Sequence, residues 1–184
     1  MKTLLTWLYR FARRFLLGTG IATVWPISAI KAKLIPWMKR DQAVVKGHRM
    51  VLDHGDILNL SLYGVYEEQE TALVEREVKT GDVVIDIGAN VGYYTLILAR
   101  QAGAGGRVFA FEPEPESFDR LRRNVAANGY DNVVLESRAV ADSSGKTRLY
   151  KSSTNMGDHR IYESEGGREA IEIECIRLDD YFRD

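Results

Sequence analysis

The sequence predicts an α/β domain built around a parallel β-sheet. The run "VVIDI" at Val83–Ile87 is apolar apart from one aspartate, which is typical of a strand covered by helices on both faces. A helical pattern follows at 91–101, a second strand at 107–112, a second helix from Pro115, and a third strand at 132–136. Strands that alternate with helices in this way indicate a parallel sheet with helices on both faces.

Two further elements are expected before the first of these strands. Weak alternation around Gly47 and Gly55 predicts a short β-hairpin. Residues 67–79 have the pattern of a helix, with Leu73 and Val74 as its apolar anchors.

Later segments give the ends of the helices and two more strands. Glycines at 103, 105 and 106 end the helix at 91–101. The helix from Pro115 ends at Gly129, and its apolar stripe is formed by Phe118, Leu121 and Val125. Residues 147–150 and 171–176 are predicted strands joined by a long polar loop, and loops of that length are often functional.

Composition sets limits on the class of protein. The chain has 184 residues, of which 45% are hydrophobic, enough for one domain with a core of its own. Its one cysteine, Cys175, excludes a disulfide within the chain and a site of several cysteine ligands. We predict no metal site, and a single cysteine is compatible with a cytoplasmic location.

Residues 1–40 form a basic head on an acidic body. They carry eight basic residues and no acidic one, whereas the remainder carries 17 basic and 26 acidic residues. Aromatic and basic side chains together favour a segment that touches the inner face of a membrane. A helical subdomain packed on the body and a signal anchor are the alternatives, although the uncharged run at 15–30 is short for a span of about 20 residues. Nucleic acid is disfavoured, because the acidic body would repel phosphates.

Polar and glycine residues gather where the first two strands of the sheet end. Ligands of open α/β sheets bind at the carboxyl ends of the strands. Asp86 lies near the end of the first strand, and Gly88 and Gly92 allow a tight turn before the next helix. Asn90 tolerates a left-handed backbone, and Glu112 ends the second strand with a carboxylate that can accept from a ribose diol. The sequence therefore predicts a nucleoside-binding site.

The glycine run does not fit the dinucleotide pattern G-x-G-x-x-G or the phosphate loop G-x-x-x-x-G-K-[ST]. Instead, the runs "GVYEEQE", "GDVVIDIGANVGYYTLILA", "VFAFEPEPESFDRLRRNVAANG", "AVADSSGKTRLY" and "IRLDDYF" resemble the FkbM family of methyltransferases. The resemblance covers roughly residues 45–184. We place the methyltransferase domain at 41–184, directly after the basic head. It implies a Rossmann-like class I methyltransferase fold and S-adenosylmethionine as the cofactor.

The resemblance also implies roles for single positions. Asp86 and the loop after it match the part that holds the methionine moiety, Glu112 matches the ribose ligand, and Ala139 and Val140 match the adenine position. Tyr66 and Glu67 fall where the family has its G-x-Y-E run, which can close over the cofactor; plain packing is the alternative for Tyr66. The cofactor-binding residues predicted in this way are Tyr66, Glu67, Asp86, Gly88, Ala89, Asn90, Gly92, Tyr94, Glu112, Pro113, Ala139 and Val140.

The predicted reaction is O-methylation of a hydroxyl group on a sugar, glycan, lipid-linked saccharide or secondary metabolite. Such a transfer depends on alignment and is helped by a general base. His159, with Asp158 beside it, is the candidate base, and the alternative is that both are solvated loop residues or shape the pocket. Two other functions stay open: a non-catalytic module that binds a membrane or partner, and a nicotinamide-dependent oxidoreductase.

The resemblance further implies a strand reading like K-I-D-x-E-G after "LDDYF", placed beside the first strand of the sheet. The sequence as given does not contain it. We therefore expect a C-terminally truncated chain, an incomplete sheet and an open, apolar edge on the first strand.

Overall fold

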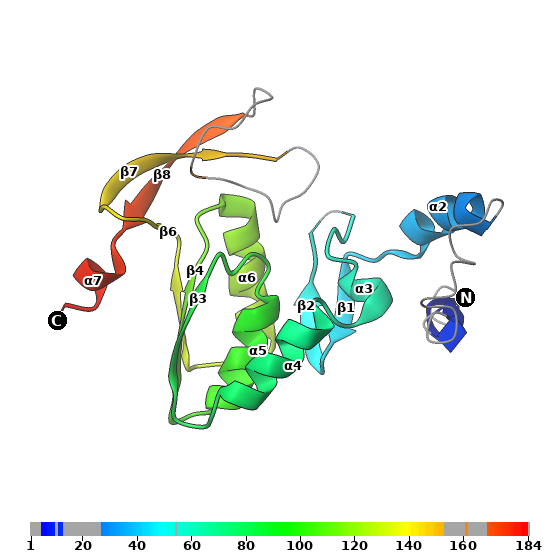
Figure 1. Ribbon diagram of the computed structural model, residues 1–184, viewed down its shortest axis with the longest axis horizontal. Helices are drawn as coiled ribbons and strands as arrows, with labels where there is room; N and C mark the ends of the chain where they lie inside the picture. The colour runs from blue at the N-terminus through cyan, green and yellow to red at the C-terminus, as the bar shows by residue number, and fades with distance from the viewer. Residues whose placement is uncertain are drawn as a thin grey trace.

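The central sheet has the predicted parallel order. A computed structural model describes residues 5–9, 11–12, 27–53, 55–152, 161 and 169–183. Strands β3 (Val83–Ile87), β4 (Arg107–Phe111) and β5 (Val133–Glu136) pair in the order β3-β4-β5, and both pairs are parallel. Helices α5 (Tyr93–Ala102) and α6 (Pro115–Ala127) connect them (Figure 1). The α/β prediction is confirmed.

One face of this sheet is covered by α5, α6 and α4 (Glu68–Glu77), which lie together on the same side (Figure 1). Leu96 and Ile97 of α5 and Leu121 of α6 are fully buried there, as the helical pattern predicts. In α4 the predicted anchor Val74 packs against the core. The prediction that Leu73 is the second anchor is wrong, because its side chain is 48% exposed and Thr71 is buried instead.

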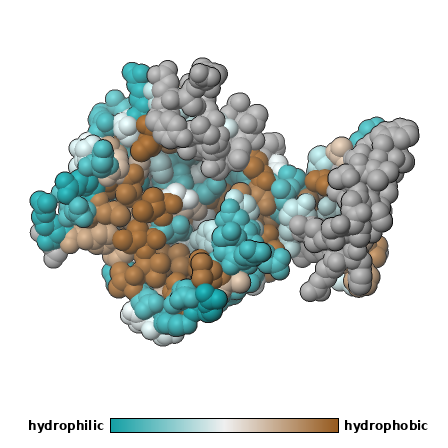
Figure 2. Space-filling model, in the orientation of Figure 1, coloured by the Kyte–Doolittle hydropathy of each residue, from teal (hydrophilic) through white to brown (hydrophobic). Residues whose placement is uncertain are grey.

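The second face of the sheet is only partly covered by the described chain. The short helix α7 (Leu178–Tyr181) lies over β4, with the rings of Tyr181 and Phe111 5.3 Å apart. Strand β3 lies at the edge of the sheet, and its residues Val83, Ile85 and Ile87 are exposed, so burial on both faces is wrong for this strand among the described residues. Figure 2 shows apolar side chains gathered over this part of the molecule, as expected for an open, apolar edge.

The predicted hairpin and a short helix precede the sheet. Strands β1 (Gln42–Val45) and β2 (His48–Val51) are antiparallel and are joined by Lys46 and Gly47, both with positive φ. Helix α3 (Leu60–Tyr63) follows.

A second, smaller sheet holds the C-terminal strands. Strands β7 (Gly145–Tyr150) and β8 (Ala170–Ile176) pair antiparallel, as the two predicted strands require. Strand β6 (Ala139–Val140), which was not predicted, pairs parallel with β8 on its other side. Ala139, Leu149, Ile173 and Cys175 form the core of this sheet.

The described part of the head is helical except for residues 39 and 40. Residues 5–9 and 11–12 are helical, and α2 covers Ile27–Met38. Among the described residues, no helix has the length and apolar character needed to cross a membrane.

Candidate cofactor site

The site begins at the carboxyl end of β3, where Asp86 stands. Its Oδ2 accepts a hydrogen bond of 2.5 Å from Oγ1 of Thr95, a fully buried residue in the first turns of α5. Burial raises the pKa of Asp86, although the hydrogen bonds from Thr95 oppose that rise. Thr95 was not predicted, and it fixes the direction of this carboxylate.

The glycine loop is attached to the neighbouring strand. The backbone N–H groups of Gly88 and Ala89 both donate to the carbonyl of Phe111, at 2.9 and 3.0 Å. Gly88, Asn90 and Gly92 all have positive φ, at 76°, 50° and 92°. The predicted glycine turn therefore exists, and it bends back over the end of β4.

Glu112 holds the same loop with its side chain. Its Oε2 accepts from the backbone N–H of Asn90 at 2.7 Å, and its Oε1 accepts from that of Glu114 at 2.8 Å. Burial raises its pKa to about 7; these two hydrogen bonds oppose the rise, and the carboxylates of Glu114 and Asp86 add to it. Glu112 thus has a role in holding the loop, while its contact with a ribose stays a prediction.

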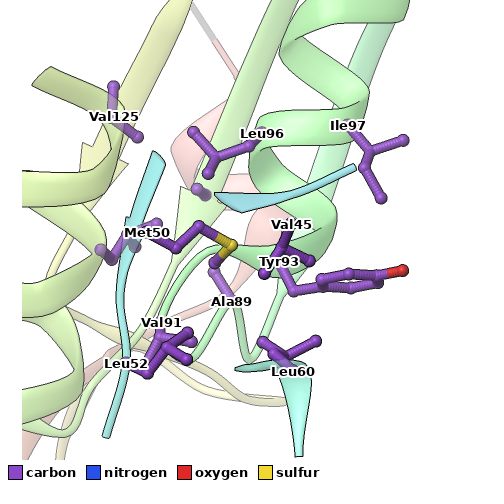
Figure 3. Close-up of a cluster of buried hydrophobic side chains, with 12 residues drawn as sticks. Val45, Met50, Leu52, Leu60, Ala89, Val91, Tyr93, Leu96, Ile97 and Val125 are labelled. Carbon is purple, nitrogen blue, oxygen red and sulfur yellow. The ribbon is translucent and has the colours of Figure 1, made fainter. Parts of the chain in front are cut away.

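A hydrophobic cluster supports the loop from the side of the hairpin. Figure 3 shows Ala89, Val91 and Tyr93 gathered with residues of β1 and β2, among them Val45 and Met50. All of these side chains are less than 9% exposed. The hairpin therefore contributes to the site by fixing the inner side of the glycine loop.

The predicted G-x-Y-E segment lies against the first turn of α5. The backbone N–H of Tyr66 donates to the hydroxyl of Tyr93 at 3.2 Å, and Thr71 Oγ1 donates to the carbonyl of Tyr66 at 2.7 Å. Tyr94 donates a hydrogen bond of 3.0 Å to Oε2 of Glu67. The structure thus brings three predicted residues, Tyr66, Glu67 and Tyr94, next to the loop.

The surroundings of Tyr66 and Tyr94 disfavour the ionised forms of their phenol groups. Burial raises the pKa of Tyr94 to about 12; Thr71 opposes the rise, and the carboxylate of Glu67 adds to it. Burial, together with Glu67 and Glu70, also raises the pKa of Tyr66. Both phenols therefore stay protonated and act as hydrogen-bond donors near neutral pH.

The loop after β4 contains a residue that sequence reasoning missed. Pro113 is half-buried, and the next residue, Glu114, is fully buried. Oε2 of Glu114 accepts from the N–H of Ser117 at 2.7 Å and caps α6, and its Oε1 lies 3.1 Å from Nζ of Lys151. A proline at the first helical position marks the start of a helix, and acidic side chains are favoured at that end, which could have drawn attention to Glu114.

The remaining predicted residues are not all placed at this loop. Ala139 is buried in the core of the second sheet and Val140 is half-buried beside it, so their adenine role stays a prediction. The candidate base His159 and its neighbour Asp158 lie outside the described residues.

The residues at the loop fit the S-adenosylmethionine that the resemblance implies. A Cβ built on Gly88 would meet no atom within 4 Å, so space is open at the end of β3. Asp86 and Glu112 offer carboxylate oxygens, which suit the cationic groups and the ribose hydroxyls of that cofactor. A cationic group bound there would also favour the ionised carboxylates, whose pKa values are raised in this structure.

Two curated proteins that the chain resembles are methyltransferases. The 31-O-demethyl-FK506 methyltransferase FkbM of Streptomyces tacrolimicus is 38% identical over 82 residues, which are 44% of this chain and 31% of that protein. A protein-L-isoaspartate O-methyltransferase of Ignicoccus hospitalis is 36% identical over 59 residues, 32% of this chain and 28% of that protein. The chain thus spans less than a third of the length of these two relatives.

The chain is also similar to the solved structure of a SAM-dependent O-methyltransferase from Thermotoga maritima, with 29% sequence identity and a TM-score of 0.38. The match covers 43% of this chain and 32% of that protein's chain. Residues 86–184, more than half of the chain, match the sequence model of the methyltransferase FkbM domain, and this match begins at Asp86 itself. The chain therefore belongs to the FkbM family of methyltransferases, with S-adenosylmethionine as its cofactor.

Proposed function

We propose that this protein transfers a methyl group from S-adenosylmethionine to a hydroxyl oxygen of a sugar, a glycan, a lipid-linked saccharide or a secondary metabolite. The observation that carries the proposal is the pair of carboxylates at the ends of adjacent strands, Asp86 and Glu112, with the glycine loop held between them. The names of the two relatives described above both refer to methyl transfer to oxygen, which supports an oxygen acceptor.

The chain's contribution to such a reaction is alignment. S-adenosylmethionine, when bound, supplies an activated methyl group, so the protein has to hold cofactor and acceptor in line. Asp86 is fixed by Thr95, and Glu112 is fixed by two backbone N–H groups, so both carboxylates are set before the ligand arrives. A preset site of this kind loses little conformational entropy on binding.

The acceptor proton needs a destination. We assign it to His159, because a neutral imidazole can take a hydroxyl proton near neutral pH, with Asp158 beside it to stabilise the imidazolium. Both belong to the polar segment between β7 and β8. The start of that segment is fixed close to the site, because Lys151 pairs with Glu114, two residues after Glu112.

Calorimetric titration of the full chain with S-adenosylhomocysteine, and separately with NAD, tests the cofactor side of the proposal. We expect binding of S-adenosylhomocysteine alone. Glu112→Ala should weaken this binding by about tenfold or more, since a hydrogen bond that involves a charged group contributes about 1.5–3 kcal/mol. Tighter binding of NAD would instead support the oxidoreductase alternative.

The acceptor side is tested with radiolabelled S-adenosylmethionine and a panel of saccharides and hydroxylated metabolites. We expect label in an ether that is stable to mild base, whereas a methyl ester would be lost. His159→Asn should lower the turnover rate and leave the dissociation constant of S-adenosylhomocysteine unchanged, while Asp142→Asn, at an exposed loop position, is the control for a surface substitution. Cofactor binding without transfer to any acceptor would favour the non-catalytic alternative.

A further inference from the structure

We propose that the basic head, residues 1–40, docks the protein on the surface of an anionic lipid bilayer. The structure describes two helical parts of the head, the first at 5–9 and 11–12 and the second α2. The docking residues are their exposed aromatic and apolar side chains: Trp7, Leu8, Phe11 and Trp37. They are called the head anchor below. This inference does not depend on methyl transfer.

The first helical part presents one side to the body and another to solvent. Thr6 is 7% exposed, and the ring of Tyr9 stacks on that of Tyr63 in α3, with centroids 6.3 Å apart. Trp7 and Phe11, one helical turn apart, are 59% and 54% exposed, and their rings stack at 5.7 Å. The helix thus packs through one side and holds a stacked aromatic pair in water.

The second helical part is attached to the body at its C-terminal end. Met38 is 1% exposed, and Nζ of Lys39 donates to the carbonyl of Asp56 at 3.0 Å. Directly before these residues, Trp37 is 42% exposed and Lys33 is exposed. An attached helix that still exposes a tryptophan beside a lysine has the side chains found at membrane–water interfaces.

The charge of the head matches an anionic surface. The eight basic residues of 1–40 stand against no acidic residue, so the whole segment is attracted to a negative potential. The acidic body has the opposite character and is repelled from the same surface, which leaves the head as the part that makes contact. Cations alone would fit any polyanion, but exposed tryptophan and leucine side chains gain most from entering the headgroup region of a bilayer.

The distribution of tryptophan makes the inference directly measurable. All three tryptophans of the chain, Trp7, Trp25 and Trp37, lie in the head. Intrinsic tryptophan fluorescence therefore reports on the head alone. Transfer of these indoles from water to the interface shifts the emission to shorter wavelength.

The experiment titrates the full chain with vesicles of phosphatidylcholine alone and of phosphatidylcholine mixed with phosphatidylglycerol, followed by fluorescence and co-sedimentation. We expect a blue shift and at least about tenfold tighter binding with the anionic vesicles. Raising the salt concentration from about 0.1 M to about 1 M should remove most of this preference, because it shortens the Debye length from about 10 to 3 Å.

Variants distinguish binding through the head anchor from non-specific adsorption of exposed apolar side chains. The double variant Trp7→Ser, Phe11→Ser should bind anionic vesicles about tenfold more weakly, since it removes two aromatic rings from the interface. Leu73→Ser, which changes a side chain 48% exposed on α4, is the matched control and should bind as the wild type does. Circular dichroism and binding of S-adenosylhomocysteine check that each variant is folded.

Three outcomes would overturn the proposal. The first is equal binding to both kinds of vesicle, and the second is an unchanged emission spectrum in their presence. The third is tighter, aromatic-independent binding to a single-stranded oligonucleotide, which would make the head a nucleic-acid contact. The wild-type titration decides the first two even if the double variant fails to fold.

Discussion

The carboxylate of Glu112 accepts a hydrogen bond of 2.7 Å from the backbone N–H of Asn90. Its second oxygen accepts from the N–H of Glu114, so one side chain joins the loop after β3 to the loop after β4. Asn90 has a φ of 50°, a left-handed conformation that costs a non-glycine residue about 1 kcal/mol. The bond to Glu112 offsets this cost and keeps the glycine loop in one conformation.

Replacing Glu112 with glutamine should therefore loosen the loop. A glutamine has one acceptor oxygen for two backbone donors, so either Asn90 or Glu114 loses its partner. We expect the free energy of unfolding to fall by about 1–3 kcal/mol and the dissociation constant for S-adenosylhomocysteine to rise about tenfold. Urea denaturation and calorimetry at about pH 8, above the pKa of about 7, measure both.

The control for this substitution is Glu116→Gln. Glu116 lies on the exposed first turn of α6, and its ion pair with Arg120 has a distance of 3.4 Å. Its loss should change stability by less than about 0.5 kcal/mol and leave ligand binding unchanged. Equal effects of the two variants would show that Glu112 acts only through its charge.

The raised pKa of Glu112 makes a second prediction, on pH. Its folded-state pKa of about 7 lies above the ordinary value of 4.5, so the folded protein holds the proton more tightly than the unfolded chain does. The stability due to this group is then complete below pH 4.5 and is lost as the pH rises to about 7. The loss over that range is about 3 kcal/mol.

Urea denaturation from acidic to neutral pH, on the wild type and on Glu112→Gln, measures this loss. The raised pKa of Asp86 acts in the same direction in both proteins, so the difference between their stability curves reports Glu112 together with its charge interaction with Asp86. We expect the wild-type curve to fall more steeply with rising pH. Parallel curves would contradict the raised pKa.

The order of strands and helices follows from the sequence, because apolar periodicity is a local property. The glycine turn and the two carboxylates follow as well, since the sequence signals for a strand end and for the turn after it lie within a few residues of each other. The partners of these groups could not be read in the same way. Thr95 and Asp86 are nine residues apart, and Lys151 and Glu114 are much farther apart along the chain.

The prediction of Leu73 as an anchor of α4 failed for the same reason, since it depends on a contact between two elements. Leu73 and Thr71 are both possible inner residues of an amphipathic helix, and only the rotation of α4 against α5 decides between them. That rotation is fixed by the bond of 3.0 Å between Thr71 Oγ1 and the hydroxyl of Tyr93. Since a buried threonine has no apolar signal, periodicity selected the leucine.

The glycines of the loop give a third prediction, because they are required for different reasons. Gly88 has a φ of 76° and open space where a Cβ would stand, whereas a Cβ on Gly92 would lie 2.7 Å from Cδ1 of Leu121. Gly88→Ala should cost only about 1–2 kcal/mol of backbone strain but place a methyl group in the cofactor space. Gly92→Ala adds an overpacking cost and should lose about 3 kcal/mol.

Gly81→Ala is the matched control, since Gly81 has a φ of 93° and open space but lies in the turn before β3. Thermal unfolding and titration with S-adenosylhomocysteine compare the three variants. We expect Gly81→Ala and Gly88→Ala to be similarly stable, and only Gly88→Ala of these two to bind the ligand about tenfold more weakly. Wild-type affinity of Gly88→Ala would place the cofactor elsewhere.

The last prediction concerns two asparagines that join α6 to β2. Asn124, fully buried, donates to the carbonyls of Val51 and Val91 at 2.9 and 2.7 Å and accepts from the N–H of Val51 at 2.6 Å. Asn128, one turn later, makes the same pair of bonds to Arg49 near the surface. Only Asn124 also reaches the glycine loop, through Val91.

Asn124→Ala should therefore lose about 3 kcal/mol of unfolding free energy, because it leaves buried backbone groups without this partner, whereas Asn128→Ala should lose about 1 kcal/mol. Asn124→Leu keeps a similar shape without a charge and removes all three hydrogen bonds, so a loss as large as that of Asn124→Ala attributes the effect to hydrogen bonding. At temperatures where each variant is folded, only the changes at Asn124 should weaken binding of S-adenosylhomocysteine. Equal weakening by Asn128→Ala would mean that the hairpin as a whole, and not the bond to Val91, sets the conformation of the loop.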